Sequence, residues 1–444
     1  MKRFAFLILV LVSLLIQTLP AFDLLTARDP FLVVMRWFTV VLLFVYAYNA
    51  KSLTTWILVA MVAGVALGFD FPSIAIHTKI FSQIFLRLIK TIIAPLIFAT
   101  LVVGIAGHSN MKQIGRMGWK SMLYFEIVTI IALFIGVAAI NISKAGEGLH
   151  MAYEKVVDLP ETKARGLSEI VLHIFPENIA KSIVEGEVLQ VVIFSVIFGL
   201  ALAMVSEKHK APFMSFAESL AEIMFKFTNI VMYLAPLGVA AAMAFTVGHM
   251  GIGVLVNLFK LLATLYVALL VFLLLVLVPI ALAFKIHIVK FVKAIAEPVS
   301  IAFATTSSEA ALPKAMKVME KFGVPRKIVA FVMPMGYSFN LDGTTLYLAL
   351  ASVFVAQAAG IAMTWEQQLM MVFTLMITSK GVAGVPRASL VILMGTAASF
   401  GLPVEPIFII IGIDELMDMA RTSVNVIGNC LATAVIAKWE GELN

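Results

Sequence analysis

The sequence predicts an all-α protein that crosses a lipid bilayer several times. Hydrophobic residues make up 62% of its 444 residues, charged residues only 13%, and the mean hydropathy is +1.05. A water-soluble chain of this length does not need so much apolar surface, whereas each membrane-spanning helix needs about 20 mostly apolar residues. The recurring apolar runs predict about eight core transmembrane helices and two re-entrant helical hairpins, arranged as inverted repeats, with one or two extra helices at the N-terminus.

Residues 1–50 form an extension ahead of the core. Residues 1–19 have a basic start and then an apolar run, a pattern typical of a signal peptide or of a first spanning helix. Residues 31–48 form a second apolar run. We favour an uncleaved hairpin of two helices, because Ala-Phe-Asp at residues 21–23 is a poor cleavage site.

The core, residues 51–440, contains apolar runs that are long enough to span a membrane, some of them at a tilt. Ahead of residue 301 the predicted spans are residues 53–68, 80–106, 119–142, 191–205, 213–247 and 254–284, and further long apolar runs follow. A more polar stretch, residues 143–187, follows the third of them, and residues 176–190 are expected to re-enter the membrane.

Lysine and arginine gather in alternate loops of the core. The turns at residues 247–253 and 358–368 contain neither, whereas the basic loops are residues 112–120, 208–210, 285–293 and 314–327. By the positive-inside rule the basic loops face the cytoplasm. This accounts for the formal net charge of +6 without a nucleic-acid partner. The alternation requires the segments around residues 307–308 and 381–384 to enter and leave on one side each, as two re-entrant hairpins.

Each hairpin segment belongs to a weak internal repeat. A small, hydroxyl- or glycine-rich segment ends in proline (residues 305–313 and 378–386), and the apolar run beyond it contains Asn-x-x-Gly (residues 340–343 and 425–428). Lipid cannot form hydrogen bonds with the N–H and C=O groups of backbone that leaves the helix. Such breaks therefore lie where protein covers them or where they line a polar cavity. Paired interruptions in two related halves indicate a transporter's binding site. We therefore expect both runs to be interrupted.

The last apolar run has polar residues at steps of 4, 3, 4 and 4, which places them on one helix face: Asp414, Asp418, Arg421, Asn425 and Asn429. A charge at membrane depth costs about 2.5–3.5 kcal/mol or more, so these residues indicate a functional path. The structural alternative is an Asp418–Arg421 pair that neutralises itself.

These residues also indicate what the path binds. Asn340, Asp342 and Asn425, with carbonyls at broken helices, supply hard oxygen ligands that suit Na⁺. Arg421 offers a rigid fork for a carboxylate, and Asp418 can accept an ammonium group. The combination predicts a site for a zwitterion with an extra carboxylate.

Residues 53–440 resemble the dicarboxylate/amino acid:cation symporter family, which includes the archaeal aspartate and mammalian glutamate transporters. Four motifs carry the resemblance in the family's order: the serine-rich tip at residues 305–313, NLDGT at 340–344, GVAGVP at 381–386 and DMARTSVNVIGN at 418–429. The rule on broken helices was drawn partly from this family, so the two inferences are not independent.

The resemblance implies a substrate site and three cation sites. Arg421 matches the residue that holds the substrate's side-chain carboxylate, and Asp418 the residue that holds its amino group. The other implied substrate contacts are Ser308 and Val385 through backbone, and Thr344, Thr422 and Asn425 through side chains. The implied cation ligands are Gly336, Asn340, Asn425 and Asn429 in one site, Ser338 and Ser379 in a second, and Asp342, Asn340 and Thr129 in a third.

The chain departs from the family's pattern at the cation sites. Asn429 stands where the sodium-coupled archaeal members have aspartate, so we expect weaker Na⁺ binding. Phe125 and Val128 replace hydroxyl side chains of the third site. Glu126 and Glu309 are proton candidates, because an apolar environment favours a neutral carboxyl. The alternatives are that Glu126 snorkels to the membrane boundary and that Glu309 has a structural hydrogen-bonding role.

The leading prediction is a symporter that imports L-glutamate or L-aspartate with H⁺, Na⁺ or both; the alternative is a C4-dicarboxylate:cation symporter. Arg421 argues against neutral amino acids, and Asp418 against C4-dicarboxylates, which lack an amine. Each charge that crosses 100 mV contributes about 2.3 kcal/mol, and an acidic amino acid carries about one net negative charge. Two or more cations are therefore needed before the membrane potential drives accumulation, and we expect H⁺ to be among them.

An enzyme is disfavoured, and no cofactor is expected beyond the coupling ions. The seven histidines show no i, i+4 pairing and no H-E-x-x-H motif. A single cysteine, Cys430, excludes an intramolecular disulfide. A pure anion channel, a further class, would not need Asp418 beside Arg421.

The resemblance implies a homotrimer in the inner (plasma) membrane that works by elevator-like alternating access. A transport unit, residues 115–142 and 254–440, would carry the substrate past a scaffold, residues 53–107 and 184–247. The two hairpins would act as gates. Arg387, just after the second proline-ended segment, replaces the small residue expected there.

Overall fold

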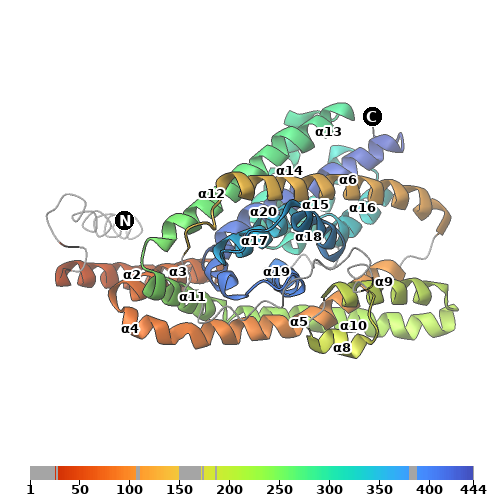
Figure 1. The fold of residues 1–444 in the computed structure, drawn as a ribbon. Coiled ribbons are helices and arrows are strands. Elements are labelled where there is room, and N and C mark those ends of the chain that lie inside the picture. Colours follow the sequence, from red (N-terminus) through yellow and green to blue (C-terminus); the bar gives the residue numbers. More distant parts are fainter. Residues whose placement is uncertain are drawn as a thin grey trace. The chain divides into compact units, whose positions relative to one another are not determined.

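The computed structural model describes residues 26, 29–106, 111–149, 172, 175–185, 188–379 and 388–443, and in these residues it contains helices and no strands (Figure 1). The predicted first helix, residues 1–19, lies outside them. By its contacts the chain divides into two compact units: Met1–Leu88, Ile230–Leu258 and Phe408–Glu415 form the first, and Ile89–Asn229, Phe259–Ile407 and Leu416–Asn444 the second. The expected scaffold and transport units concern motion and stay a prediction.

The first unit is built on two helices, α3 (Leu53–Asp70) and α11 (Ala235–Met250), which pack closely. A Cβ atom at Gly64 would lie 2.3 Å from the carbonyl oxygen of Ala240, so glycine is what lets the two backbones approach. The helix predicted at residues 31–48 is confirmed as α2 (Pro30–Ala50), which packs on α3 through an ion pair between Arg36 and Asp70 (2.7 Å).

Other predicted spans are confirmed as helices. A short segment, α4 (Pro72–Ala75) and η2 (Ile76–Thr78), precedes α5 (Lys79–Ala106). The next helices are α6 (Met111–Ser143), α8 (Ile179–Glu185), α9 (Val188–Met204) and α10 (Glu207–Met232). Within the described residues, six helical segments are long and apolar enough to cross a membrane, or seven if α10 and α11 together form one span.

Proline changes two of the predicted spans. Residues 213–247 were expected to form one helix, but α10 ends at Met232 and α11 starts at Ala235, with Pro236 in its first turn. The span at residues 254–284 consists of α12 (Val254–Phe272), one π-helical segment, η3 (Leu273–Leu277), and α13 (Val278–Ala283). Pro279, which follows the π-helical segment, accounts for it, because a proline has no N–H to donate and its ring crowds the preceding turn.

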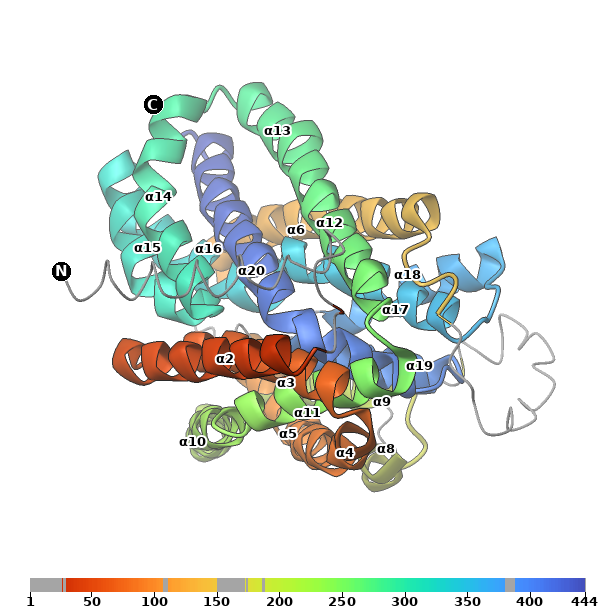
Figure 2. The same cartoon turned by 90° about the vertical axis from the view of Figure 1, so that its left-hand side faces the viewer.

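The second unit contains the helices that carry the predicted site. The first predicted hairpin is a helix–turn–helix of α14 (Ile288–Thr305) and α15 (Ser308–Phe322), which lie side by side in Figure 2. The helices that follow are α16 (Arg326–Phe339), α17 (Asp342–Ala358), α18 (Trp365–Thr378), α19 (Ala388–Ser399) and α20 (Glu405–Trp439). The tip of the second predicted hairpin, residues 380–387, lies outside the described residues, between α18 and α19.

Helix α17 forms the core of this unit. All of its residues except Gln357 are buried, and it packs along α6. A Cβ at Gly136 of α6 would lie 2.4 Å from the carbonyl oxygen of Leu346, so the two helices again touch through backbone. Because α17 is buried on all sides, it needs no polar face, and its sequence is accordingly apolar around nearly the whole helix.

The two predicted helix breaks have different outcomes. Asn340 (φ −134°, ψ 67°) and Leu341 (φ −100°, ψ 66°) leave the helical conformation between α16 and α17, so the first break is confirmed. The second was wrong, because α20 runs without interruption through residues 425–428. Gly428 instead permits a close contact: its Cβ would lie 2.2 Å from Oδ2 of Asp342.

Candidate functional site

The break between α16 and α17 places polar side chains in the protein interior. Asn340, Asp342 and Asn429 are each at most 1% exposed. The Asn340 Nδ2 donates hydrogen bonds to Oδ2 of Asp342 (3.2 Å) and to Oδ1 of Asn429 (3.3 Å). Asp342 lies in the first turn of α17, where the helix dipole stabilises a carboxylate.

This polar cluster has unused bonding capacity. Oδ1 of Asn340 and Nδ2 of Asn429 are buried and have no hydrogen-bond partner among the residues that the structure describes. Buried polar atoms are nearly always satisfied in proteins, so these two neighbouring exceptions leave hydrogen-bonding or coordinating capacity for a further ligand. The oxygen and nitrogen of an amide can exchange places by a flip of the side chain, so either group can present an oxygen to a cation.

Three glycines allow α16, α17 and α20 to meet at this point. A Cβ at Gly336 would lie 2.1 Å from Oδ1 of Asn429, and one at Gly343 would lie 2.3 Å from the carbonyl oxygen of Arg421. Gly428 makes the third contact, with Asp342. Real side chains do not approach so closely, so the geometry of the cluster depends on glycine at all three positions.

The charged pair predicted on the last helix is formed. Nε of Arg421 donates to Oδ1 of Asp418 at 3.0 Å, and the hydroxyl of Thr422 donates to the same oxygen at 2.8 Å. Arg421 is 1% exposed and Asp418 4%. This is the ion pair of the structural alternative, and it compensates both charges within the protein.

Tyr347 was missed by the sequence analysis. The guanidinium carbon of Arg421 lies 4.0 Å from the centroid of the Tyr347 ring, so the aromatic face contributes a cation–π contact. Tyr347 follows Thr344 by three residues on α17, which places both on one face of that helix. This spacing from Thr344 is the sequence signal that could have identified Tyr347 as a neighbour of the site.

The amide of Asn425 links α20 to α17. Its Oδ1 accepts from the backbone N–H of Thr344 (3.1 Å), and its Nδ2 donates to the Thr344 hydroxyl (2.8 Å). Asn425 lies one turn from Arg421 and one turn from Asn429 on the same face. The Thr344–Asn425 pair therefore lies between the ion pair and the polar cluster.

The other predicted residues lie at helix ends or on neighbouring helices. Ser308 is buried at the start of α15, after a turn in which Thr306 has a positive φ of 51° and Ser307 caps the helix. Ser379 is buried at the end of α18, and its hydroxyl donates to the Met376 carbonyl (3.4 Å).

Three further candidates lie on α6 and α15. Thr129 is buried on α6, and Glu126 is half-buried there beside the fully buried Phe125. Glu309 is half-buried in the first turn of α15. Val385, Arg387 and the side chain of Ser338 lie outside the described residues.

Comparison with known proteins identifies a family. The model of the sodium:dicarboxylate symporter family matches residues 53–439. A proton/sodium-glutamate symport protein of Geobacillus stearothermophilus is 42% identical over 398 residues, which cover 87% of this chain and 94% of the relative. A proton/glutamate-aspartate symporter of Escherichia coli (strain K12) is 40% identical, over 88% and 94%. A C4-dicarboxylate transport protein of Paraburkholderia phymatum is 41% identical, over 89% and 94%.

Proposed function

Because the chain belongs to the sodium:dicarboxylate symporter family, we propose that it imports acidic amino acids, L-glutamate or L-aspartate, together with H⁺, Na⁺ or both. The family and these relatives are symporters and not enzymes, and the chain is an integral, multi-pass membrane protein. In bacteria the membrane of such a protein is the plasma membrane.

The buried Arg421–Asp418 pair is the observation that supports an amino acid substrate. An acidic amino acid can replace both partners at once: its side-chain carboxylate pairs with the Arg421 guanidinium, and its ammonium group with the Asp418 carboxylate. Both buried charges then stay compensated, with and without substrate. A C4-dicarboxylate lacks the ammonium group and would leave Asp418 without a cationic partner, so we favour amino acids although C4-dicarboxylate transport proteins are equally similar.

The polar cluster supports a site for a coupling cation. Asp342 supplies one negative charge, and the amides of Asn340 and Asn429 supply uncharged oxygens. With asparagine and not aspartate at position 429, the cluster has one carboxylate fewer and should hold Na⁺ more weakly, which favours a cycle that uses H⁺. Thr344 and Asn425 bond to each other between the cluster and the ion pair, so a cation at the cluster would lie close to a side chain that is one helical turn from the substrate's arginine.

The test is uptake of radiolabelled L-aspartate by proteoliposomes, with a Na⁺ gradient and a pH gradient imposed separately. Uptake driven by pH alone would support H⁺ coupling. Uptake that requires Na⁺ would mean that Asn429 still completes a working cation site. An absence of uptake with either gradient, together with uptake of succinate, would contradict the amino acid assignment.

Asp418→Asn separates the two substrate classes. The variant keeps the shape of the side chain and removes the charge that pairs with ammonium. The L-aspartate concentration that gives half-maximal uptake should therefore rise by about tenfold or more. Inhibition by succinate, which has no ammonium, should not weaken, because the Arg421 guanidinium still pairs with a carboxylate. An equal loss of both would refute the role of Asp418.

We also propose a homotrimer with elevator-like alternating access, in which the α14–α15 hairpin acts as one gate. The resemblance to the family supports this arrangement. Native mass spectrometry of the purified protein should give the mass of three chains, and a monomer under the same conditions would contradict it.

A further inference from the structure

A cavity lies at the C-terminal end of α20, the helix that carries the Arg421–Asp418 pair. Its volume is about 540 Å³, and it is lined by the start of α14, the end of α15 and the end of α20. Two of the predicted cytoplasmic loops, residues 285–293 and 314–327, contribute to it, so by the positive-inside rule it opens on the cytoplasmic side.

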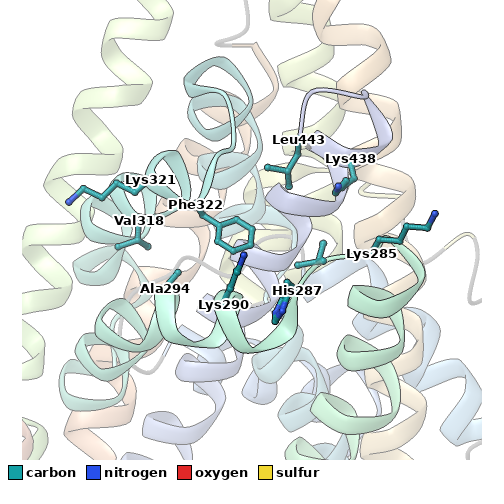
Figure 3. Close-up of a pocket in the computed structure, with 10 residues that line it drawn as sticks. Lys285, His287, Lys290, Ala294, Val318, Lys321, Phe322, Lys438 and Leu443 are labelled. Atoms are coloured by element: carbon teal, nitrogen blue, oxygen red, sulfur yellow. The ribbon is translucent and has the colours of Figure 1, made fainter.

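The lining of this cavity is strongly basic. Lys285, Lys290, Lys321, Lys438 and His287 line it, and none of its ten lining residues, all in the described part of the chain, is acidic. Figure 3 shows Lys290, His287 and Phe322 at its centre with Lys438 nearby, whereas Lys285 and Lys321 extend outward on opposite sides. The flexible stems of these two lysines allow their ammonium groups to turn over a bound group.

These lysines differ from their neighbours in their pairing. Lys314 pairs with Glu297 (2.6 Å), and Lys327 with Glu442 (2.7 Å). Among the described residues, no ion pair joins a carboxylate to any of the four lysines of the cavity. The N-terminus of α14 adds to the positive potential, because its first turn contains no acidic residue and the side chain of its N-cap residue, His287, makes no capping hydrogen bond.

The chemistry of the lining indicates the class of ligand. The lining offers four lysines, which bind phosphate as point charges, and none of its ten described residues is an arginine. A cavity of this size accommodates more than one phosphate group. Phe322, Val318 and Leu443 make part of the wall apolar, which suits the organic part of a phosphodiester.

We propose that this cavity binds a phosphate-bearing anion through Lys290 and Lys438. Two sources have this chemistry: the headgroup of an anionic phospholipid in the cytoplasmic leaflet, and a soluble phosphate compound. In either case the anion would join the base of the α14–α15 hairpin to the end of α20, at a place separate from the Arg421–Asp418 pair.

Binding is measured on the full-length protein in a neutral detergent after lipid removal. Phosphatidylglycerol and phosphatidylcholine with identical acyl chains are titrated by native mass spectrometry, and inorganic pyrophosphate by calorimetry. We compare the wild type with Lys290→Gln/Lys438→Gln. The matched control is Lys293→Gln/Lys317→Gln, which removes two exposed lysines from α14 and α15 that do not line the cavity.

The cavity variant should bind the phosphate-bearing probe about tenfold more weakly or worse, and the control variant should match the wild type. Added salt should weaken wild-type binding, because Lys290 is exposed and Lys438 is only half-buried. Lys290→Arg/Lys438→Arg keeps both charges and should keep binding, which separates a loss of charge from a loss of folding.

The two probes identify the source. Binding of phosphatidylglycerol over phosphatidylcholine that depends on Lys290 and Lys438 supports a lipid headgroup, and binding of pyrophosphate with the same dependence supports a soluble phosphate. The proposal is overturned if neither probe depends on these lysines, or if the cavity and control variants lose binding equally.

Discussion

At the scale of single residues, the central feature is a charged pair with little exposure to water. The Arg421 guanidinium is held by Asp418 on one side and by the Tyr347 ring on another. Removal of one partner of such a pair leaves the other charge buried and uncompensated, which costs about 3–5 kcal/mol. A substrate that brings opposite charges for both partners avoids this cost, so the pair itself contributes to selectivity.

Arg421→Cys should abolish transport of acidic amino acids. Loss of the guanidinium removes the partner of the substrate's side-chain carboxylate and should cost about 2–5 kcal/mol of binding, which is about 30-fold or more in affinity. Competition of radiolabelled L-aspartate with serine and alanine measures the change, because the neutral cysteine is expected to admit neutral amino acids. Unchanged affinity for aspartate would contradict the site assignment.

Asn429→Asp should strengthen Na⁺ dependence. The new carboxylate would lie next to Asn340, which already bonds to Asp342, and a second negative charge raises the attraction for a cation. We expect the Na⁺ concentration for half-maximal uptake to fall by about tenfold or more. Uptake driven by a pH gradient is the internal control, and an unchanged Na⁺ response would exclude Asn429 from a cation site.

At the scale of elements, glycine determines how α16, α17 and α20 meet. Gly336, Gly343 and Gly428 each face a polar atom of a neighbouring helix at a distance that no side chain permits. The polar cluster therefore depends on helix separation as well as on its own side chains. In both Asn-x-x-Gly sequences the glycine lies within a helix and serves close packing, Gly343 in α17 and Gly428 in α20. The motif alone therefore does not determine whether the helix breaks.

Gly428→Ala should destabilise the protein and disturb the cation cluster. The new Cβ would lie 2.2 Å from Oδ2 of Asp342, and overpacking of this kind costs about 1–3 kcal/mol. Thermal unfolding in detergent gives the loss of stability. Gly118→Ala on α6 is the matched control, because its Cβ would lie 3.7 Å from Phe331 and should be neutral or slightly stabilising. Equal melting temperatures for the two variants would contradict the close contact.

At the scale of the whole molecule, contacts between distant parts of the sequence hold the ends of the helices together. Glu440, just after α20, pairs with Arg116 and Lys120 of α6, and the Lys120 ammonium also donates to the Trp439 carbonyl (3.0 Å). Burial raises the pKa of the Glu440 carboxyl, whereas the hydrogen bonds and charges of Lys120 and Arg116 lower it. Together these two partners outweigh burial, so the net shift of the pKa is downward.

This pairing predicts how stability depends on pH. A carboxyl whose pKa is lower in the folded state stabilises the protein above its unfolded pKa, and this contribution is lost as the pH falls through the folded pKa. Glu440→Gln should therefore melt at a lower temperature than the wild type at pH 7. The difference between the two should shrink as the pH is lowered towards 3. A difference that is independent of pH would mean that the carboxylate charge does not contribute.

Several features of the fold and site could be predicted from local sequence. The apolar runs predicted the helices α2, α3, α5, α6 and α9, because the length of an apolar run and the thickness of a bilayer are directly related. The steps of three and four along α20 placed Asp418, Arg421, Asn425 and Asn429 on one face, because helical spacing depends only on residue number. The helix break at Asn340 also followed from the sequence.

Tertiary structure alone decided which of these residues meet. The Thr344–Asn425 and Asn340–Asn429 hydrogen bonds join residues 81 and 89 positions apart, and the basic cavity brings together the loop before α14, the end of α15 and the C-terminal end of α20. The role of Gly428 as a packing contact was likewise visible only once Asp342 was in place. Periodicity and propensity act over a few residues, whereas these contacts depend on the packing of whole helices, which no local pattern encodes.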